Sequence, residues 1–136
     1  MDTHFVSTRH NQGMAFTSDV NGHLVSMNSS ADGLQTGVSP KRLMLASLAG
    51  CTGIDVVSIL EKMKVTFTDF SIDVDATLSE EHPRIYKQVK ITYYIKIADD
   101  EKGKMEKAVT LSQEKYCGVS AMFGAFSKID TEIKFL

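Results

Sequence analysis

The feature that most constrains the fold of this chain is a long apolar segment, residues 43–63. Ser39 and Pro40 precede it, and these residue types are preferred at the N-cap and at the first position of a helix. Large apolar side chains fall on nearly every face of the predicted helix, and a helix of that kind is buried on all sides. A chain of 136 residues has difficulty covering so long a helix, which indicates that a second subunit supplies the missing cover. The apolar residues are Leu43, Met44, Leu45, Leu48, Ile54, Val56, Val57, Ile59, Leu60 and Met63.

Polar residues and glycines interrupt this segment, among them Ser47, Thr52 and Asp55, so we do not expect a transmembrane helix. Residues 1–5 have neither a basic region nor an apolar run, and we expect no secretory signal. Two cysteines do not make a disulfide scaffold. The expected location is the cytoplasm, where both thiols are reduced.

The composition is that of an ordinary globular domain, with 43% hydrophobic and 24% charged residues. The formal net charge of −2 argues against a nucleic-acid-binding protein and against a polybasic membrane-surface protein. The length and the lack of an evident linker predict a single domain over residues 1–136.

Short strands are predicted before the helix, at residues 4–9, 14–20 and 23–28. Asn21-Gly22 between the last two is a strong hairpin signal. Residues 28–39 are rich in Ser, Gly, Asp and Asn, and we expect a loop there.

After the helix, alternating apolar residues predict two long strands, 66–78 and 85–97, which form an antiparallel hairpin. Helices are expected at 99–114 and 117–128, and a last strand at 129–135. Strands, a buried helix, strands, helices and a strand in this order indicate the α+β fold class.

The two cysteines occupy different settings. Cys51 lies mid-way along the apolar helix beside Gly50 and Gly53, and a glycine inside a helix costs about 1 kcal/mol relative to alanine. That cost suggests that another backbone or a ligand approaches closely. Cys117 is expected near the N-terminal end of the last helix, where the helix dipole favours a thiolate. The alternative is that both are small core residues, and their separation of 66 positions does not say whether they meet.

Metal and cofactor sites receive little support from the sequence. A zinc site needs about four ligands with short paired spacings, whereas the cysteines are single and the histidines are scattered. We therefore expect neither a metal nor a cofactor. Asp73 and Asp75 fall on one strand face and are interpreted as a solvated face. The histidines are His4, His10, His23 and His82.

Two segments nevertheless resemble a known family. Residues 39–60, SPKRLMLASLAGCTGIDVVSIL, strongly resemble the central helix of the OsmC/Ohr family, and residues 111–120, LSQEKYCGVS, resemble its second cysteine segment. His82-Pro83 between two long strands is similar to the OsmC-like branch. The resemblance implies an OsmC-like fold, in which antiparallel sheets wrap around long central helices in an intertwined homodimer with active sites at the interface.

The resemblance also implies a function, the thiol-dependent reduction of organic or inorganic hydroperoxides. By the family pattern Cys51 matches the peroxidatic cysteine and Cys117 the resolving one. A thiolate attacks the peroxide and becomes a sulfenic acid, and the second thiol condenses with it to a disulfide. An external thiol or dithiol then restores the pair by exchange.

One departure from the family pattern concerns charge. Hydroperoxide reductases of this family pair an arginine with a glutamate near the start of the central helix, whereas Lys41 and Arg42 stand ten and nine residues before Cys51 here. Arg9 is the only arginine of the N-terminal strands and is the candidate partner of the thiolate, and Lys41, Arg42 or His10 is the alternative source of positive charge. The missing glutamate favours an alternative, a binding protein for a small or lipid-like ligand with weak or no peroxidase activity. The intact cysteine pair favours the enzyme.

Overall fold

The computed structural model of this chain describes residues 1–29 and 36–136. These form two compact units, residues 1–44 and 45–136, which are described separately. The single domain stays a prediction, and residues 30–35 of the predicted loop lie outside the described residues. In chain order the elements are β1 (Val6–His10), β2 (Phe16–Val20), β3 (His23–Met27), α1 (Pro40–Lys62), β4 (Phe67–Leu78), β5 (Tyr86–Ile97), η2 (Asp99–Glu101), α2 (Lys102–Leu111), η3 (Ser112–Tyr116), α3 (Gly118–Gly124) and β6 (Lys128–Phe135).

The N-terminal unit contains an antiparallel sheet in the order β1-β2-β3. The predicted hairpin between β2 and β3 is confirmed, because Asn21 and Gly22 adopt φ values of 53° and 83°. Positive φ at both positions is the requirement of a type I′ turn. The Gly22 N–H also donates to Asp19 Oδ1 at 3.0 Å, which fixes the turn.

The long helix α1 begins where the sequence predicts. Pro40 is its first residue, and the Arg42 N–H donates to Ser39 Oγ at 3.4 Å, so Ser39 acts as the N-cap. The predicted α+β class is therefore confirmed, with strands on both sides of one long helix in the chain order.

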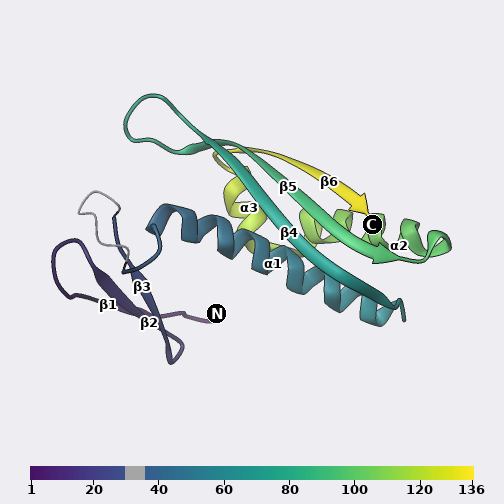
Figure 1. Ribbon diagram of the computed structural model, residues 1–136, viewed down its shortest axis with the longest axis horizontal. Coiled ribbons are helices and arrows are strands. Elements are labelled where there is room, and N and C mark those ends of the chain that lie inside the picture. Colours follow the sequence, from purple (N-terminus) through teal and green to yellow (C-terminus); the bar gives the residue numbers. More distant parts are fainter. Residues whose placement is uncertain (30–35) are drawn as a thin grey trace. The chain divides into compact units, whose positions relative to one another are not determined.

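The C-terminal unit contains a second sheet in the order β4-β5-β6 (Figure 1). The predicted hairpin of β4 and β5 is antiparallel, as expected, with a bulge where Asp69 adopts φ 55°. β6 differs from the expected antiparallel arrangement, because it pairs with β5 in parallel. The physical reason is the helical connection from β5 to β6, which returns the chain to the start of β5 before the last strand begins.

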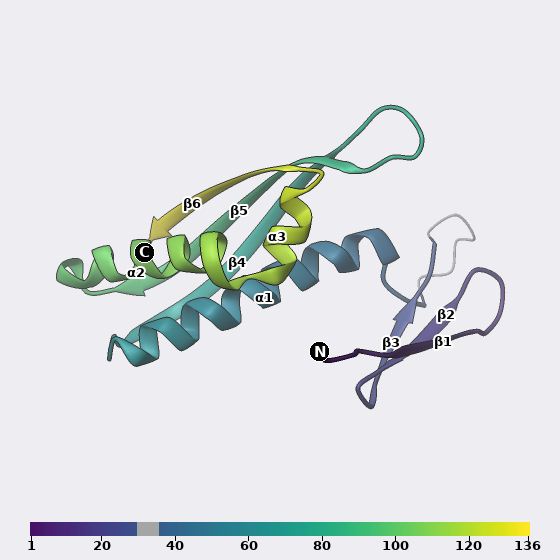
Figure 2. The ribbon, with the colours of Figure 1, turned by 180° about the vertical axis from the view of Figure 1, so that it is seen from behind.

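Helix α1 buries one face against this sheet and the later helices. Leu48, Thr52, Val56 and Leu60 recur at every fourth position and are fully buried. Ile54, on another face, keeps an exposed fraction of 72%. A single chain thus covers one face only, and the expectation of burial on all sides is not met within it. Figure 2 shows α1, α2 and α3 together on one side of the sheet.

By length and composition α1 could cross a membrane, a test that the core helix of a soluble protein also passes. Thr52 on its covered face makes buried hydrogen bonds to β5 and to η3. The α1 face that carries Thr52 therefore packs against other parts of the protein.

The predicted helix over residues 99–114 is divided into three elements. The 3₁₀ turn η2 and helix α2 are followed by η3, a π-helical turn in which the Cys117 N–H donates to the Ser112 carbonyl at 2.8 Å. The last predicted helix is shorter than expected, because α3 ends at Gly124 and β6 begins at Lys128. The π turn matters for the site, since π turns inside helices occur frequently at functional positions.

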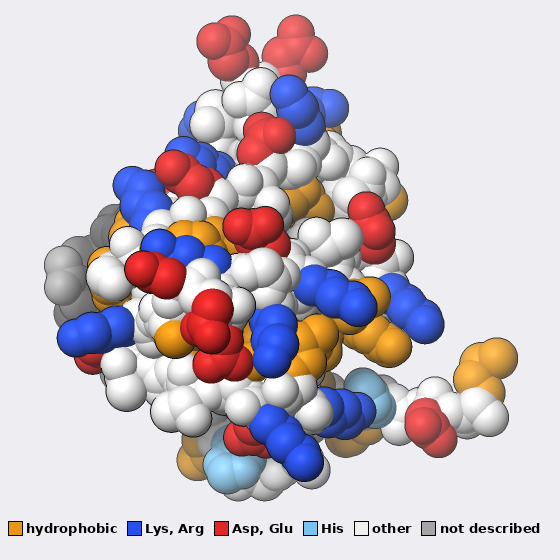
Figure 3. Space-filling model, turned by 90° about the vertical axis from the view of Figure 1, so that its right-hand side faces the viewer, with side chains coloured by type: hydrophobic (Ala, Val, Ile, Leu, Met, Phe, Trp, Pro, Cys, Tyr) orange, Lys and Arg blue, Asp and Glu red, His pale blue; other side chains and the backbone are white. Residues whose placement is uncertain are grey.

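The surface carries both charge signs. In Figure 3 the Lys and Arg side chains are interspersed with Asp and Glu, and small apolar areas lie between them. On the face shown, this distribution agrees with the small net charge of −2.

Candidate functional site

The fold of the C-terminal unit brings the two cysteines together. Their sulfur atoms and a carboxylate oxygen of Asp55 all lie within 4.8 Å of one another. Cys51 and Asp55 stand one helical turn apart on α1, and Cys117 is the N-cap of α3. The sequence separation of the cysteines gave no information on this contact, which the packing of α3 beside α1 creates.

Both sulfur atoms accept backbone hydrogen bonds from the first turn of α3. The Ser120 N–H donates to Cys117 Sγ at 3.3 Å, and the Val119 N–H donates to Cys51 Sγ. The predicted position of Cys117 at the N-terminal end of this helix is confirmed. Two consecutive amides therefore hold the thiol pair in place.

The environment of Cys51 opposes ionisation of its thiol. Burial raises the pKa of Cys51 most, and contact with Cys117 and the charge of Asp55 raise this pKa further. The hydrogen bond from the Val119 N–H lowers the pKa and offsets part of the effect. Cys51 is consequently held as a thiol until a positive charge or a proton acceptor reaches it.

A buried chain of hydroxyl groups leads to the third member of the cluster. Ser112 Oγ donates to Asp55 Oδ2 at 2.9 Å, and the distance between Thr52 Oγ1 and Ser112 Oγ is 2.8 Å. Tyr93 Oη lies 2.7 Å from Thr52 Oγ1. Because each hydroxyl has a single proton, the first bond fixes the direction of the others. Tyr93 donates to Thr52, Thr52 donates to Ser112, and Ser112 donates to Asp55.

Gln113 completes this network from η3. Its Nε2 donates to Thr52 Oγ1 at 3.3 Å and to Tyr93 Oη at 3.1 Å. Burial raises the pKa of Tyr93, while its hydrogen bonds with Thr52 and Gln113 partly oppose this shift. Tyr93 thus stays a neutral phenol at physiological pH and acts as the first donor of the chain. The π turn places two successive residues, Ser112 and Gln113, in the same network.

Sequence reasoning missed these polar residues. The signal for Asp55 is its spacing, four positions after Cys51 on a helix, because residues at i and i+4 lie on the same face. Thr52 carried a second signal as a polar residue inside an apolar helix. Tyr93 and Gln113 gave no local signal, since only the tertiary fold brings them to Thr52.

A pocket of about 320 Å³ adjoins the cluster. Asp55 belongs both to this pocket and to the cysteine cluster. Apolar side chains from the end of α1, from Met63 just after it, and from the end of α2 and η3 line most of the pocket, so it suits a ligand with an apolar body. The lining residues are Asp55, Ser58, Ile59, Lys62, Met63, Leu111 and Tyr116.

The predicted basic partners belong to the N-terminal unit. Arg9 lies in β1 and is exposed, and Lys41 and Arg42 are exposed in the first turn of α1. The proposed role of Arg9 beside the thiolate stays a prediction. Of the predicted catalytic residues, the structure brings together Cys51 and Cys117.

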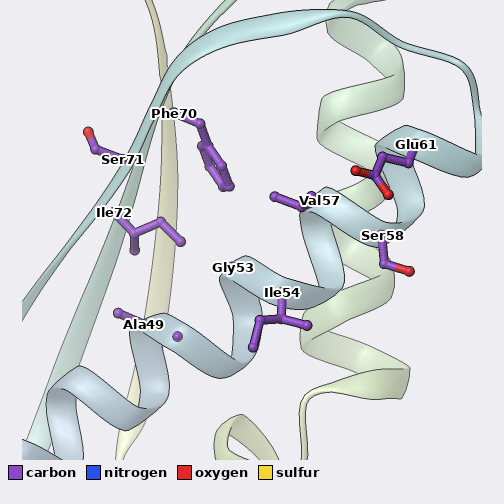
Figure 4. Close-up of a pocket in the computed structure, with 10 residues that line it drawn as sticks. Ala49, Gly53, Ile54, Val57, Ser58, Glu61, Phe70, Ser71 and Ile72 are labelled. Atoms are coloured by element: carbon purple, nitrogen blue, oxygen red, sulfur yellow. The ribbon is translucent and has the colours of Figure 1, made fainter.

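A second, wider pocket of about 630 Å³ opens between α1 and β4. Phe70 of β4 and Val57 of α1 point toward each other in this pocket (Figure 4). The predicted close approach at Gly53 is explained within the chain, because a Cβ there would lie 3.0 Å from the Ile72 side chain. A Cβ at Gly50 would meet no atom of residues 1–29 or 36–136 within 4 Å. Gly50 therefore faces an open apolar surface.

Comparisons with known proteins agree on one family. The family model described as OsmC-like protein matches residues 32–132. Protein YhfA of Escherichia coli strain K12 is 30% identical over 112 residues, which is 82% of each chain. The crystal structure of a hypothetical protein from Aquifex aeolicus VF5 is 27% identical, with a TM-score of 0.88 over 100% of this chain and 98% of the other. The organic hydroperoxide resistance protein OhrB of Bacillus subtilis has the same fold, with 23% identity and a TM-score of 0.71 over 98% of both chains.

Proposed function

This chain belongs to the OsmC-like family, and we propose on that premise that it reduces organic hydroperoxides with Cys51 and Cys117. The observation that carries the proposal is the contact of the two thiols, whose sulfur atoms lie within 4.8 Å. A second thiol at this distance captures a sulfenic acid before further oxidation destroys it. The likeness to a structure named for organic hydroperoxide resistance supports the same chemistry.

The proposed reaction begins at Cys51. Its sulfur attacks one peroxide oxygen, the O–O bond breaks, and the alcohol leaves after taking a proton. The product is a Cys51 sulfenic acid. The Cys117 thiol then attacks the Cys51 sulfur, releases water and forms the disulfide. One hydroperoxide and two thiols thus give one alcohol, one water and one disulfide, and an external thiol or dithiol reduces the disulfide again.

The pocket of about 320 Å³ supports an organic rather than a small inorganic peroxide. Asp55 at the cluster and Ile59, Met63 and Leu111 beyond it give the pocket a polar end and an apolar body. An alkyl or aryl group fits the apolar part while the peroxide lies beside the sulfur atoms. We therefore place the substrate among hydroperoxides with an apolar substituent.

A homodimer forms part of this proposal. The apolar surface at Gly50, Ile54 and Val57 needs cover, and Ile54 alone is 72% exposed in a single chain. The occupant we propose is a second copy that packs its own α1 against this surface. Obligate interfaces of this kind bury on the order of 2,000–5,000 Å² in total. Arg9 of either copy is the proposed cation beside the Cys51 thiolate.

The test compares two matched serine variants. Reduced wild-type protein, Cys51→Ser and Cys117→Ser are each mixed with cumene hydroperoxide in metal-free buffer, and peroxide loss is followed by stopped flow. We expect the wild type and Cys117→Ser each to consume one equivalent of peroxide rapidly, because no external thiol is present, and we expect no fast phase for Cys51→Ser. Mass spectrometry of Cys117→Ser should find sulfenic or sulfinic acid on Cys51.

Two outcomes would contradict the assignment. If Cys51→Ser is oxidised at Cys117 as fast as the wild type consumes peroxide, the two roles are reversed. If neither thiol reacts faster than free cysteine, the peroxidase proposal fails. The pocket then supports the alternative function, binding of a small or lipid-like ligand.

A further inference from the structure

The cluster of Cys51, Asp55 and Cys117 has the composition of a metal site. Each residue offers one ligand atom, and the three atoms lie within 4.8 Å of one another. Two sulfur donors favour a soft or borderline cation over Mg²⁺ or Ca²⁺. The single cysteines give little support for zinc in the sequence, and the fold supplies the proximity that their spacing does not show.

The distances suit a tetrahedral cation after a small adjustment. Zinc–sulfur and zinc–oxygen bonds of about 2.3 and 2.0 Å place tetrahedral donors roughly 3.5–3.8 Å apart. Donors within 4.8 Å thus need to close by roughly 1.0–1.3 Å at most, which side-chain rotation allows. Cys51 and Asp55 also stand at i and i+4 of one helix, the spacing at which two ligands of helical zinc motifs share a face.

The charges of the cluster are unbalanced without a cation. Among residues 1–29 and 36–136 no lysine or arginine forms an ion pair with Asp55. A bound dication balances the Asp55 carboxylate and, by coordinating the sulfur atoms, deprotonates the thiols.

Two neighbouring hydroxyl groups complete the setting. Ser112 Oγ donates to Asp55 Oδ2, which orients the carboxylate and leaves its other oxygen for a cation, as a residue behind a metal ligand does. Ser120 Oγ is buried and has no hydrogen-bond partner within the part of the chain that the structure describes. The Ser120 N–H contacts Cys117 Sγ, so this hydroxyl belongs to a residue beside the cluster. An unpartnered buried hydroxyl points to a further polar molecule there, such as a metal-bound water.

We infer that Cys51, Asp55 and Cys117 bind Zn²⁺ as a three-ligand site, with the fourth position taken by water. The inference goes beyond peroxide reduction and does not depend on it. Occupied by Zn²⁺, the site holds both sulfur atoms as thiolates and withholds them from the disulfide. The metal-loaded protein is therefore expected to resist thiol alkylation and to consume peroxide more slowly than the metal-free protein.

The test uses the full chain, reduced and freed of metal with a chelator. Zn²⁺ is titrated in competition with a chromophoric chelator, and Co²⁺ replaces it for optical spectra. We expect one metal per chain and a sulfur-to-cobalt charge-transfer band. Cys51→Ser and Cys117→Ser should weaken this band. Asp55→Asn keeps an oxygen acceptor for Ser112 but should weaken Zn²⁺ binding by on the order of tenfold or more.

The matched control is Asp73→Asn, an exposed aspartate of β4, which should bind Zn²⁺ like the wild type. Binding without a fixed stoichiometry, or equal affinity of Asp55→Asn and the wild type, would overturn the site. Circular dichroism of each variant establishes that it is folded. The peroxide assay in metal-free buffer fails or succeeds independently, so the two proposals are distinguished.

Discussion

Two faces of helix α1 differ in what covers them. The α1 face that carries Leu48, Thr52 and Val56 is fully buried by the chain's own sheet and helices. The face that carries Gly50 and Ile54 is apolar but open. Composition does not separate them, because both are rich in large apolar side chains. The difference is that the first face meets partners within the chain, whereas the second is the face on which we propose that a second copy packs.

Polar groups sharpen this contrast. On the covered face Thr52 bonds to Tyr93 and Ser112, so the buried hydroxyls are satisfied. On the open face the pocket is lined mostly by apolar groups such as Ile54, Val57 and Phe70. Such a surface favours another apolar surface over water. One helix thereby holds a site on one side and a proposed subunit interface on the other.

The largest effect is expected on the covered face. Leu48→Ala removes a side chain with 0% exposure and should lower the free energy of unfolding by about 2–5 kcal/mol. Denaturant unfolding at fixed protein concentration measures this. A loss below about 1 kcal/mol would show that α1 packs more loosely on the sheet than described.

A substitution on the open face of α1 should change dimer association rather than the stability of the fold. Ile54→Asp places a charge on the proposed interface, and the dimer dissociation constant should rise at least a hundredfold, about 2.7 kcal/mol. Sedimentation velocity measures the oligomeric state, and circular dichroism should show a retained fold. A wild-type protein that is a folded monomer at micromolar concentration would refute the dimer.

Removal of one buried hydroxyl tests the polar network. Thr52→Val leaves Tyr93 Oη, Ser112 Oγ and Gln113 Nε2 without a shared partner, and should cost about 1–3 kcal/mol. Thr110→Val, at an exposed position of α2, is the control for the substitution itself. Equal unfolding free energies of the two variants would contradict the network.

Two glycines give a matched pair with smaller effects. Among the residues that the structure describes, a Cβ at Gly50 of α1 or at Gly103 of α2 meets no atom within 4 Å. Gly103→Ala should therefore stabilise its helix by about 0.5–1 kcal/mol. Gly50→Ala should lack this gain and weaken the dimer, because the new methyl group meets the second copy. Thermal unfolding measures the stability of both variants. If the two substitutions stabilise the protein equally, a second copy does not approach closely at Gly50.

The smallest effect concerns an exposed ion pair. Lys90 Nζ lies 2.7 Å from Glu132 Oε2, which lowers the pKa of Glu132 and raises the pKa of Lys90. Because the pKa of Glu132 is lower in the folded state, its ion pair stabilises the fold fully at pH above the unfolded-state pKa. This stabilisation is lost as the pH falls through the folded-state pKa. Because the pKa of Lys90 is higher in the folded state, its stabilisation is fully present at pH below the unfolded-state pKa. It is lost as the pH rises through the folded-state pKa.

The stability difference between wild type and Lys90→Met should thus be present from about pH 5 to pH 10 and decline on both sides. Thermal unfolding across pH measures it. A difference that persists unchanged at about pH 2 would assign the effect to packing rather than charge.

Much of the fold was predictable from local signals. Ser39-Pro40 marked the start of α1, Asn21-Gly22 marked a hairpin, and alternating residues marked β4 and β5. The parallel pairing of β6 was not predictable, because register depends on where the connecting helices return the chain. The one-sided burial of α1 was also hidden, since an apolar pattern does not say whether the cover comes from the same chain.

The site was predictable only in part. The resemblance singled out Cys51 and Cys117, and the structure brings their sulfur atoms within 4.8 Å of each other. Asp55 had a local signal in its helical spacing, while Tyr93 and Gln113 reach Thr52 from elements distant in the sequence. Such contacts follow from tertiary packing, which no local pattern encodes.

The π turn η3 lies between α2 and Cys117, and it also sets the direction in which Cys117 leaves the axis of α2. Each residue advances an α-helix by about 100°, so a wider turn of five residues before Cys117 shifts everything that follows. Deletion of one residue from Ser112–Tyr116 would restore α-helical winding and rotate Cys117 by about that angle. The meeting of the two thiols thus depends on a single additional residue of winding, far in sequence from the helix that carries Cys51.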